Sequence, residues 1–591
     1  MKRLNLLFVA SLVAITGCLK DHTTRSQLDE ESDKPKVRTV GDAAEFQTAG
    51  AIPVSGVGLV VGLNGTGGGT PPGAYRQMME EQLKRNKIDN PKAWLDSPDT
   101  ALVLLTAHIP AGSRAGERVD VEITLPPGSK AKSLRGGYLL ESPLASYASQ
   151  GQVRAYLEQN DIKPVGGGDG LLKGHVLADA EGPLHFGLED KETKAEVKAN
   201  PDLPEGGVRR AWVWKGAKSK VSQPFFLVLN PDQQRYRMAG VVTERINETF
   251  HGPGALDKIA KQRNADSVML TIPPQYRNNP THFFRVVRMI PIERVDDNSE
   301  YRQRLENELQ EPETTLTASL RLEALGRSSI PVLRETMKTS KYPLVRFAAA
   351  EALAYLGEPI AANTLASLTE KHPSLQAYCL TALTSLDEAA STFALQDLLA
   401  SELPEVRYGA FKAMREREPR TYSSKDQMMN KSFWLHKVAP EASPLVHLLN
   451  NGRAEITVFG KTPKLVAPFS LRAGPDLVVT ARPGDASVTI SRFSTNKPQR
   501  QEQCSFAVVD VVKGLADLGA HYEDVVELLT QARDVKALGC ELRIDAFPKG
   551  AEIKRLAEHA RGDKMMEKEA DLMKEPADRL KTVNVFDTVQ R

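Results

Sequence analysis

Residues 56–73 read GVGLVVGLNGTGGGTPPG, and this glycine-rich stretch is the natural starting point for the amino-terminal half of the chain. Glycines let backbone N–H groups gather around a phosphate, so a nucleotide site is the first interpretation to test. No Gly-Lys-Ser/Thr sequence closes a phosphate loop, and Gly56, Gly58 and Gly62 miss the dinucleotide spacing by one residue. A Pro-Pro pair also interrupts the helix start that would hold the anion. The stretch therefore predicts a strand and turns punctuated by glycine.

Around that stretch, from Val54 to Arg294, short runs of β-branched and aromatic residues alternate with glycine and proline. Such runs predict strands, and we expect helices at Tyr75–Lys87 and Ala239–Phe250. The predicted strands are VGLVVGL, TALVLLTAHI, RVDVEITL, RRAWVWKG, FFLVLN, SVMLTI and FFRVVRMIPI. The sequence therefore indicates a mixed α+β body, whose first part we assign to residues 50–294.

Residues 312–419 repeat themselves about every thirty residues, a period typical of a solenoid. Each repeat opens on a proline, which the first turn of a helix tolerates. The tenth residue after each proline is apolar: Leu322, Leu353, Leu383 and Met414. This pattern predicts an all-α stack that resembles HEAT-type repeats, whose curved surface usually docks another protein. A plain helical bundle is the alternative.

Strand-like runs return after the repeats, in AEITVFG, DLVVTARP, ASVTISRF and CELRIDAF. Helices are expected at Ser505–Leu518 and Tyr522–Lys536. We assign residues 446–547 to a second α+β part. The highly charged tail, residues 561–591, is expected to stay unpacked.

The first residues, 1–18, read MKRLNLLFVASLVAITGC and predict an export signal, because the apolar run is too short to span a bilayer. Cys18 follows small residues, as in the bacterial lipobox, and would carry several acyl chains. Leu19 rather than an acidic residue follows it, which favours the outer membrane. An ordinary secretory signal with a chance cysteine is the alternative. Residues 19–49, polar and mixed in charge at their start, are expected to be a flexible linker.

Composition argues against several classes of function. The 77 basic and 75 acidic residues nearly cancel, and no dense basic block interleaved with aromatics is present, so nucleic acid is not an expected partner. The eleven histidines are scattered without metal-ligand spacing, so neither a metal nor another cofactor is predicted. Ser129 and Lys132 have the spacing of a serine acyl-transfer pair, but they lie in a proline- and glycine-rich loop and their companion motifs are missing. We therefore expect no enzyme.

Three cysteines remain once Cys18 is assigned to lipidation. Cys379 lies among alanines and leucines at helical spacing and is expected to be a buried small apolar residue. Cys504 and Cys540 are candidates for a disulfide in an oxidising periplasm, although the sequence does not fix their separation in space.

Four blocks of the chain resemble the flagellar basal-body P-ring family. The first is GVGLVVGLNGTG (residues 56–67), and the second runs from Thr100 to Leu144 and contains a Ser-Leu-Arg-Gly-Gly turn. VVTERINETFHGPGALDKIAKQRNADSVMLTIP forms the third, and the fourth lies beyond the repeats, from Arg453 onward. The signature residues, to which we assign structural roles in turns and close strand approaches, are Gly56, Gly58, Gly62, Gly65, Gly67, Ser133, Leu134, Arg135, Gly136 and Gly137.

The resemblance implies a structural role. P-ring subunits assemble with identical subunits in the periplasm, around the flagellar rod and next to the L ring, as a bushing at the level of the peptidoglycan. They have no catalytic residues to carry over. The helical repeats would be an insertion in the P-ring body, with the polar stretches Val295–Glu311 and Arg420–Lys431 returning the chain. An unknown protein would dock on the repeats.

Two features depart from the family pattern: the lipobox cysteine and the inserted repeats. They support an alternative function, in which the chain is a membrane-tethered envelope lipoprotein that uses its P-ring-like domain and its helical repeats as a protein-interaction scaffold. An enzyme is a third and weaker hypothesis.

Overall fold

The computed structural model describes residues 37–47, 50–149, 171–186, 208–251, 258–295, 299–417, 427–438, 441–450, 453–493 and 499–551. The predicted signal with Cys18, the linker as far as residue 36 and the charged tail lie outside these residues. Among the described helices, none combines the length and the apolar character needed to cross a bilayer. The fold is α+β, with β-rich parts on either side of a helical stretch, as the sequence predicts.

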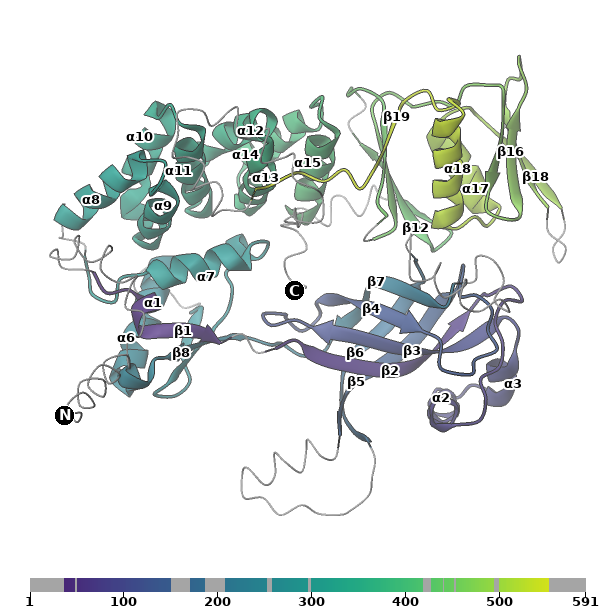
Figure 1. The fold of residues 1–591 in the computed structure, drawn as a ribbon, viewed down its shortest axis with the longest axis horizontal. Coiled ribbons are helices and arrows are strands. Elements are labelled where there is room, and N and C mark those ends of the chain that lie inside the picture. The colour runs from purple at the N-terminus through teal and green to yellow at the C-terminus, as the bar shows by residue number, and fades with distance from the viewer. Residues whose placement is uncertain are drawn as a thin grey trace, which may run out of the picture.

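A closed six-stranded barrel holds the glycine-rich stretch (Figure 1). Its strands, in the order in which they pair around the barrel, are β2 (Ile52–Val61), β3 (Thr100–Ile109), β4 (Arg118–Thr124), β7 (Arg210–Ser219), β6 (Leu171–Pro183) and β5 (Tyr138–Ser149). Alternate residues of β4 are buried, because successive side chains of a strand point to opposite faces. Two short helices, α2 (Ala74–Arg85) and α3 (Pro91–Asp96), pack beside β2 and β3.

A four-stranded sheet forms a small module whose apolar core also includes Leu320, Ala324 and Tyr355 of the helices that follow it. Its strands are β1 (Ala44–Gln47), β8 (Phe225–Leu229), β10 (Ser267–Leu270) and β9 (Ala260–Gln262), with helices α1 (Val40–Ala43), α6 (Tyr236–His251) and α7 (Pro280–Met289). The end of the predicted flexible linker is therefore ordered. There, β1 pairs antiparallel with β8, and the Val40 N–H donates to the Ile290 carbonyl at 2.9 Å.

The predicted strand FFRVVRMIPI is wrong, because its residues form most of helix α7. Asn279 caps the helix by accepting from the His282 N–H at 3.1 Å, and Pro280 occupies the first turn. The buried residues Phe283, Val286 and Val287 follow helical rather than strand spacing. The Asn279-Pro280 pair is a helix-start signal, but the β-branched residues that follow favour a strand by propensity.

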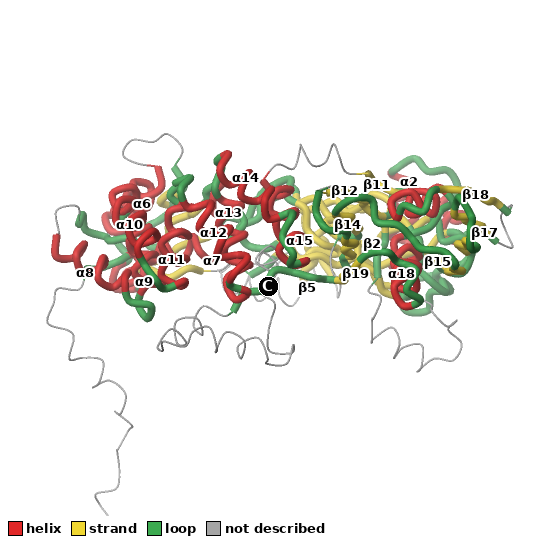
Figure 2. The backbone as a smooth tube through the Cα atoms, turned by 90° about the horizontal axis from the view of Figure 1, so that it is seen from above, coloured by secondary structure: helices red, strands yellow, loops and turns green. Residues whose placement is uncertain are grey.

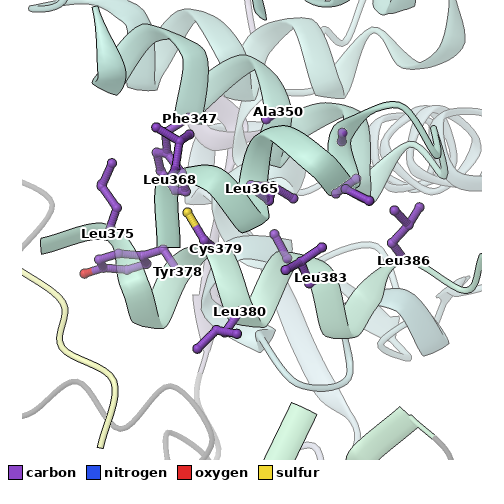
Figure 3. Close-up of a cluster of buried hydrophobic side chains, with 14 of the residues drawn as sticks. Phe347, Ala350, Leu365, Leu368, Leu375, Tyr378, Cys379, Leu380, Leu383 and Leu386 are labelled. Atoms are coloured by element: carbon purple, nitrogen blue, oxygen red, sulfur yellow. The ribbon is translucent and has the colours of Figure 1, made fainter. Parts of the chain in front are cut away.

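A row of helices, here called the helical insert (residues 299–417), follows this module (Figures 1 and 2). It contains α8 (Ser299–Gln310), α9 (Thr315–Ala324), α10 (Ile330–Thr339), α11 (Pro343–Tyr355), α12 (Ala361–Lys371), α13 (Gln376–Ser385), α14 (Ala389–Leu398) and α15 (Pro404–Arg417), with short 3-10 turns η3 (Gly326–Ser329) and η4 (Pro373–Leu375). The four apolar residues predicted to recur in phase are all buried. Cys379 of α13 is also buried, and it faces Phe347 of α11 and Leu368 of α12 (Figure 3).

The remaining β-rich part, here called the carboxyl-terminal module (residues 427–545), contains two sheets that share a core with two helices. One sheet has β11 (Gln427–Met429), β12 (Phe433–Val438), β14 (Glu455–Phe459), β13 (Leu445–Leu448) and β19 (Glu541–Ile544), and the other has β15 (Phe469–Ala473), β16 (Leu477–Ala481), β17 (Val488–Arg492) and β18 (Arg500–Cys504). Helices α17 (Val508–Asp517) and α18 (Tyr522–Asp534) lie between them (Figure 1). The module begins before the predicted start at residue 446, because β12 pairs with β14.

Candidate functional site: the contact between the barrel and the carboxyl-terminal module

The signature glycines lie where the backbone turns or where two segments approach closely. Gly62 and Gly65 have φ values of +82° and +87°, a left-handed backbone conformation that residues with a Cβ rarely adopt. A Cβ on Gly56 would lie 2.5 Å from the Pro143 carbonyl oxygen of β5, and one on Gly67 would lie 2.3 Å from the Thr100 carbonyl oxygen. At Gly56 and Gly67 any other residue would therefore force a neighbouring backbone segment to move.

The glycine loop is bonded directly to the Ser-Leu-Arg-Gly-Gly turn. The Thr66 carbonyl accepts from the N–H groups of Lys132 at 2.7 Å and Ser133 at 3.1 Å. The Thr66 hydroxyl donates to the Ser133 carbonyl at 2.9 Å. The Ser133 hydroxyl in turn accepts from the N–H groups of Arg135 and Val208, both at 3.2 Å. Two blocks that the sequence separates by more than sixty residues therefore form one rigid surface.

This surface contacts the start of α18 in the carboxyl-terminal module. The Arg135 guanidinium donates to the Asp524 carboxylate at 2.6 Å, and Asp524 also accepts from the His521 N–H at 2.8 Å, which caps α18. Gly136 has a φ of +72°, and a Cβ there would lie 2.7 Å from His521 Nε2. Gly474 approaches the same carboxylate, since a Cβ added at this position would lie 2.2 Å from Asp524 Oδ1.

A second polar pair lies deeper in the contact. His185 Nδ1 and Glu523 Oε1 are 3.7 Å apart, and both side chains are buried. The Tyr522 ring packs edge-on against His185, and its hydroxyl donates to the Leu449 carbonyl at 2.6 Å. Burial lowers the pKa of His521, although Asp524 and Glu523 oppose the shift. The sequence did not single out these α18 residues, because their partners lie in the distant barrel.

The sequence raised two kinds of chemistry, a metal site and the pair Ser129 and Lys132. Within the described ranges, no group of three or more His, Cys, Asp or Glu residues has the geometry of a metal site. Ser129 lies in a loop where its N–H bonds the Pro126 carbonyl and its hydroxyl accepts from the Ala131 N–H at 3.4 Å. The geometry supports rigid positioning of two modules.

The candidate disulfide between Cys504 and Cys540 is not formed. Both thiols are free; Cys504 ends β18 of one sheet and Cys540 precedes β19 of the other. Burial raises the pKa of each to about 11, so both are protonated thiols at neutral pH.

A buried polar cluster joins α9 and α11 of the helical insert to the preceding module, and we call it the amino-terminal joint (Tyr276, Asn279, His282, Glu323, Glu351 and Tyr355). Glu323 of α9 accepts from the Tyr276 hydroxyl at 2.6 Å and lies 2.9 Å from His282 Nε2. Tyr355 stacks on His282 with ring centroids 4.2 Å apart. Burial alone would lower the pKa of His282, but Glu323 and Glu351 more than compensate, so its pKa is raised.

The helical insert ends at a second buried cluster, the carboxyl-terminal joint (Tyr408, Arg415, His436, His447 and Glu455). Glu455 of β14 accepts from the Tyr408 hydroxyl at 2.6 Å and from the Arg415 guanidinium at 2.5 Å. Tyr408 stacks on His447 with centroids 3.9 Å apart. Burial would raise the pKa of Glu455, but Arg415 outweighs it and holds that pKa well below the usual value. Burial lowers the pKa of His447 to about 4.

Known proteins give this arrangement a context. The family model described as flagellar P-ring protein matches residues 39–158, which include the glycine loop and the Ser-Leu-Arg-Gly-Gly turn. The chain is similar to the flagellar P-ring protein of Thermotoga petrophila, with 28% identity over 254 residues, 43% of this chain and 66% of that protein. It is also similar to those of Nitratidesulfovibrio vulgaris (28% over 255 residues, 43% of this chain and 61% of that protein) and Pseudomonas syringae pv. tomato (30% over 237 residues, 39% and 56%).

The match is partial in both directions, since the chain spans no more than 66% of the length of these relatives. It nevertheless rests on the residues that build the barrel's contact surface. Over residues 39–158 the chain is therefore similar to the flagellar P-ring protein family.

Proposed function

We propose that the chain is a structural subunit of the flagellar basal-body P ring, which assembles with identical subunits around the rod in the periplasm. Its role is mechanical rather than catalytic. The observation that carries the proposal is the match of the family model to the residues that form the glycine loop and its partner turn. Head-to-tail contacts that close by rotation give such a ring.

The direct test is to purify basal bodies from cells that make the chain and to locate it by cryo-electron microscopy with an antibody label. We expect the chain in the ring around the rod, and we expect a deletion strain to lose motility. Swimming deletion cells whose complete basal bodies lack the chain would overturn the proposal.

A matched pair of glycine variants tests whether the barrel contact matters for this role. Gly136→Ala and Gly116→Ala both place alanine at a positive φ (+72° and +90°), which costs about 1–2 kcal/mol. Only Gly136→Ala also brings a Cβ against His521, since nothing lies within 4 Å of the position on Gly116. We expect Gly136→Ala to reduce incorporation into basal bodies, whereas Gly116→Ala incorporates normally. Equal incorporation of the two variants would show that the barrel contact is not needed for assembly.

Lipidation of Cys18 is a separate proposal that rests on the sequence alone. We expect Cys18→Ser to release the chain from membranes, and the tether to lie in the outer membrane, as Leu19 favours. Metabolic labelling with a radioactive fatty acid is the measurement, and an unlabelled wild-type chain would contradict the proposal. Membrane fractionation then identifies which membrane holds the chain.

The helical insert supports a second candidate function, that of an envelope lipoprotein that uses the insert as a protein-interaction scaffold. The observation in its favour is that α8–α15 lie beyond the residues that the family model matches. The proline-initiated helices and recurring buried leucines support HEAT-type repeats. Intact motility in a deletion strain, together with co-purification of an envelope protein that depends on residues 299–417, would favour this function over the ring.

A further inference from the structure

The residues that follow β19 pack against the helical insert. After Ile544 the chain leaves the carboxyl-terminal module and crosses α15 to reach α13, as the yellow segment of Figure 1 shows. We call residues 547–551 the strap and the surface between α13 and α15 the strap groove. Pro548 and Ala551 are buried, whereas Lys549 between them is exposed.

The strap completes the start of helix α13. Leu375 stands at the N-cap of α13 and offers no side-chain acceptor. The N–H of Ala377 instead donates to the Lys549 carbonyl at 2.9 Å, and the Ala551 N–H donates to the Ser374 carbonyl at 3.0 Å. A backbone carbonyl from the far end of the chain therefore satisfies a donor that an isolated helix would leave open.

Two buried polar side chains also bond the strap. The Tyr378 hydroxyl donates to the Ala551 carbonyl at 2.8 Å, and Gln376 Oε1 accepts from the Lys549 N–H at 3.3 Å. Tyr378 is 8% exposed and Gln376 is 3% exposed. Figure 3 shows the pale yellow chain passing beside Tyr378. Both groups are aimed at the strap backbone, and buried polar groups without partners are rare.

Three residues of the strap fit closely against their neighbours. Phe547 packs edge-on against Tyr408, with ring centroids 5.9 Å apart. A Cβ on Gly409, within α15, would lie 2.3 Å from Pro548 Cγ, so a glycine that weakens the helix makes room for the proline. Gly550 meets the Tyr378 ring, since its Cβ would lie 3.2 Å from Tyr378 Cε2.

We propose that the strap groove is a recognition site for an extended peptide of the form aromatic-Pro-x-Gly-small, and that residues 547–551 occupy it in cis as a latch. Main-chain hydrogen bonds hold any backbone, while the aromatic, proline and glycine positions give specificity. Only Asp545 and Ala546 separate the latch from β19, so its effective concentration at the groove is high and a free peptide competes poorly. The latch fixes the helical insert to the closing strand of the carboxyl-terminal module.

Peptide binding to the full-length chain tests the site. A fluorescent peptide with the sequence of residues 546–551 is titrated against the wild type and against the Phe547→Ala/Pro548→Ser double variant, which weakens the latch. We expect at least tenfold tighter binding to the double variant, loss of that binding on adding Gly409→Val, and none for a scrambled peptide. Equal binding to the wild type and the double variant, or binding that survives Gly409→Val, would overturn the proposal.

Hydrogen exchange separates release of the latch from unfolding. In the double variant we expect the Ala377 amide to exchange at least tenfold faster than in the wild type, while amides in the middle of α11 keep their protection. Saturating peptide should restore protection at Ala377. Unchanged exchange at Ala377 would show that the strap does not cap α13. A concentration-dependent dimer that protects Ala377 would show occupation by a second copy and would exclude the cis latch.

Discussion

The two joints of the helical insert use similar groups but differ in the basic side chain that pairs with the buried glutamate. Each buries a glutamate that accepts from a tyrosine hydroxyl at 2.6 Å, beside a histidine stacked on a tyrosine. In the carboxyl-terminal joint Arg415 supplies a permanent cation, and the pKa of Glu455 is held well below its usual value. In the amino-terminal joint the group bonded to the carboxylate is His282, whose pKa is raised. The pair of Arg415 and Glu455 keeps its charges at any ordinary pH, whereas the pair of His282 and Glu323 depends on pH.

The largest effect is expected from removing that arginine. Arg415→Met leaves Glu455 buried without its strongest partner, and uncompensated buried charges cost about 3–5 kcal/mol. The free energy of unfolding from urea titration is the measurement. Arg85→Met, which breaks an exposed pair with Glu81, is the control and should cost less than about 1 kcal/mol. Similar losses in the two variants would contradict the role given to Arg415.

Acid should weaken the carboxyl-terminal joint. Because the pKa of His447 falls from 6.5 to about 4 on folding, its contribution is fully present above pH 6.5 and is lost as the pH falls toward 4. The difference corresponds to about 3 kcal/mol. Thermal midpoints of the wild type between pH 7 and pH 4.5 should therefore fall more steeply than those of His447→Gln. Parallel curves would show that His447 is not the titrating group.

Alkali should weaken the amino-terminal joint. The pKa of His282 is raised, so its contribution is fully present below pH 6.5 and is lost as the pH rises through the raised value. Burial also raises the pKa of Glu351, which acts in the same direction. Glu323, Tyr276, Tyr355 and Arg285 also face this imidazole.

Limited proteolysis at pH 6 and pH 8.5, corrected for protease activity, measures this opening. We expect cleavage near α9 to accelerate at the higher pH in the wild type and to be insensitive to pH in His282→Gln. A variant that keeps the pH dependence of the wild type would assign the effect to another group.

The smallest expected effects come from the two tyrosine hydroxyls. Tyr276→Phe and Tyr408→Phe each remove one hydrogen bond to a buried glutamate, and such bonds to charged groups contribute about 1.5–3 kcal/mol. Urea midpoints should fall by similar amounts in both variants. A loss confined to one of them would show that the joints share geometry but not energetics.

The sequence predicts elements well where the pattern is local. Leu322, Leu353, Leu383 and Met414 recur in phase and are all buried, since a helix buries one face at a fixed period. Strand β3 spans the residues predicted, Thr100–Ile109. Helix α7 was missed because its β-branched and aromatic residues favour a strand by propensity, while its cap and its burial in the small module favour a helix.

The contacts that organise the molecule could not be predicted in the same way. Arg135 and Asp524 are 389 residues apart, and no periodicity relates them. The glycine loop and the Ser-Leu-Arg-Gly-Gly turn could be recognised by resemblance, but their bonding through Thr66 could not. Pairings of this kind depend on the closed barrel and on the position of α18, which are properties of the whole fold.

The strap also has a consequence for how the chain is made. Tyr378 precedes its partner Ala551 by 173 residues, and synthesis adds about 5–20 residues per second. Roughly ten to thirty-five seconds therefore pass between synthesis of the start of α13 and synthesis of the strap that caps it. A chain cut short before Phe547 would contain every helix of the insert and yet leave α13 open to water and proteases. Among the described residues the strap is the last segment to be synthesised, so α13 is completed only after most of the chain has been made.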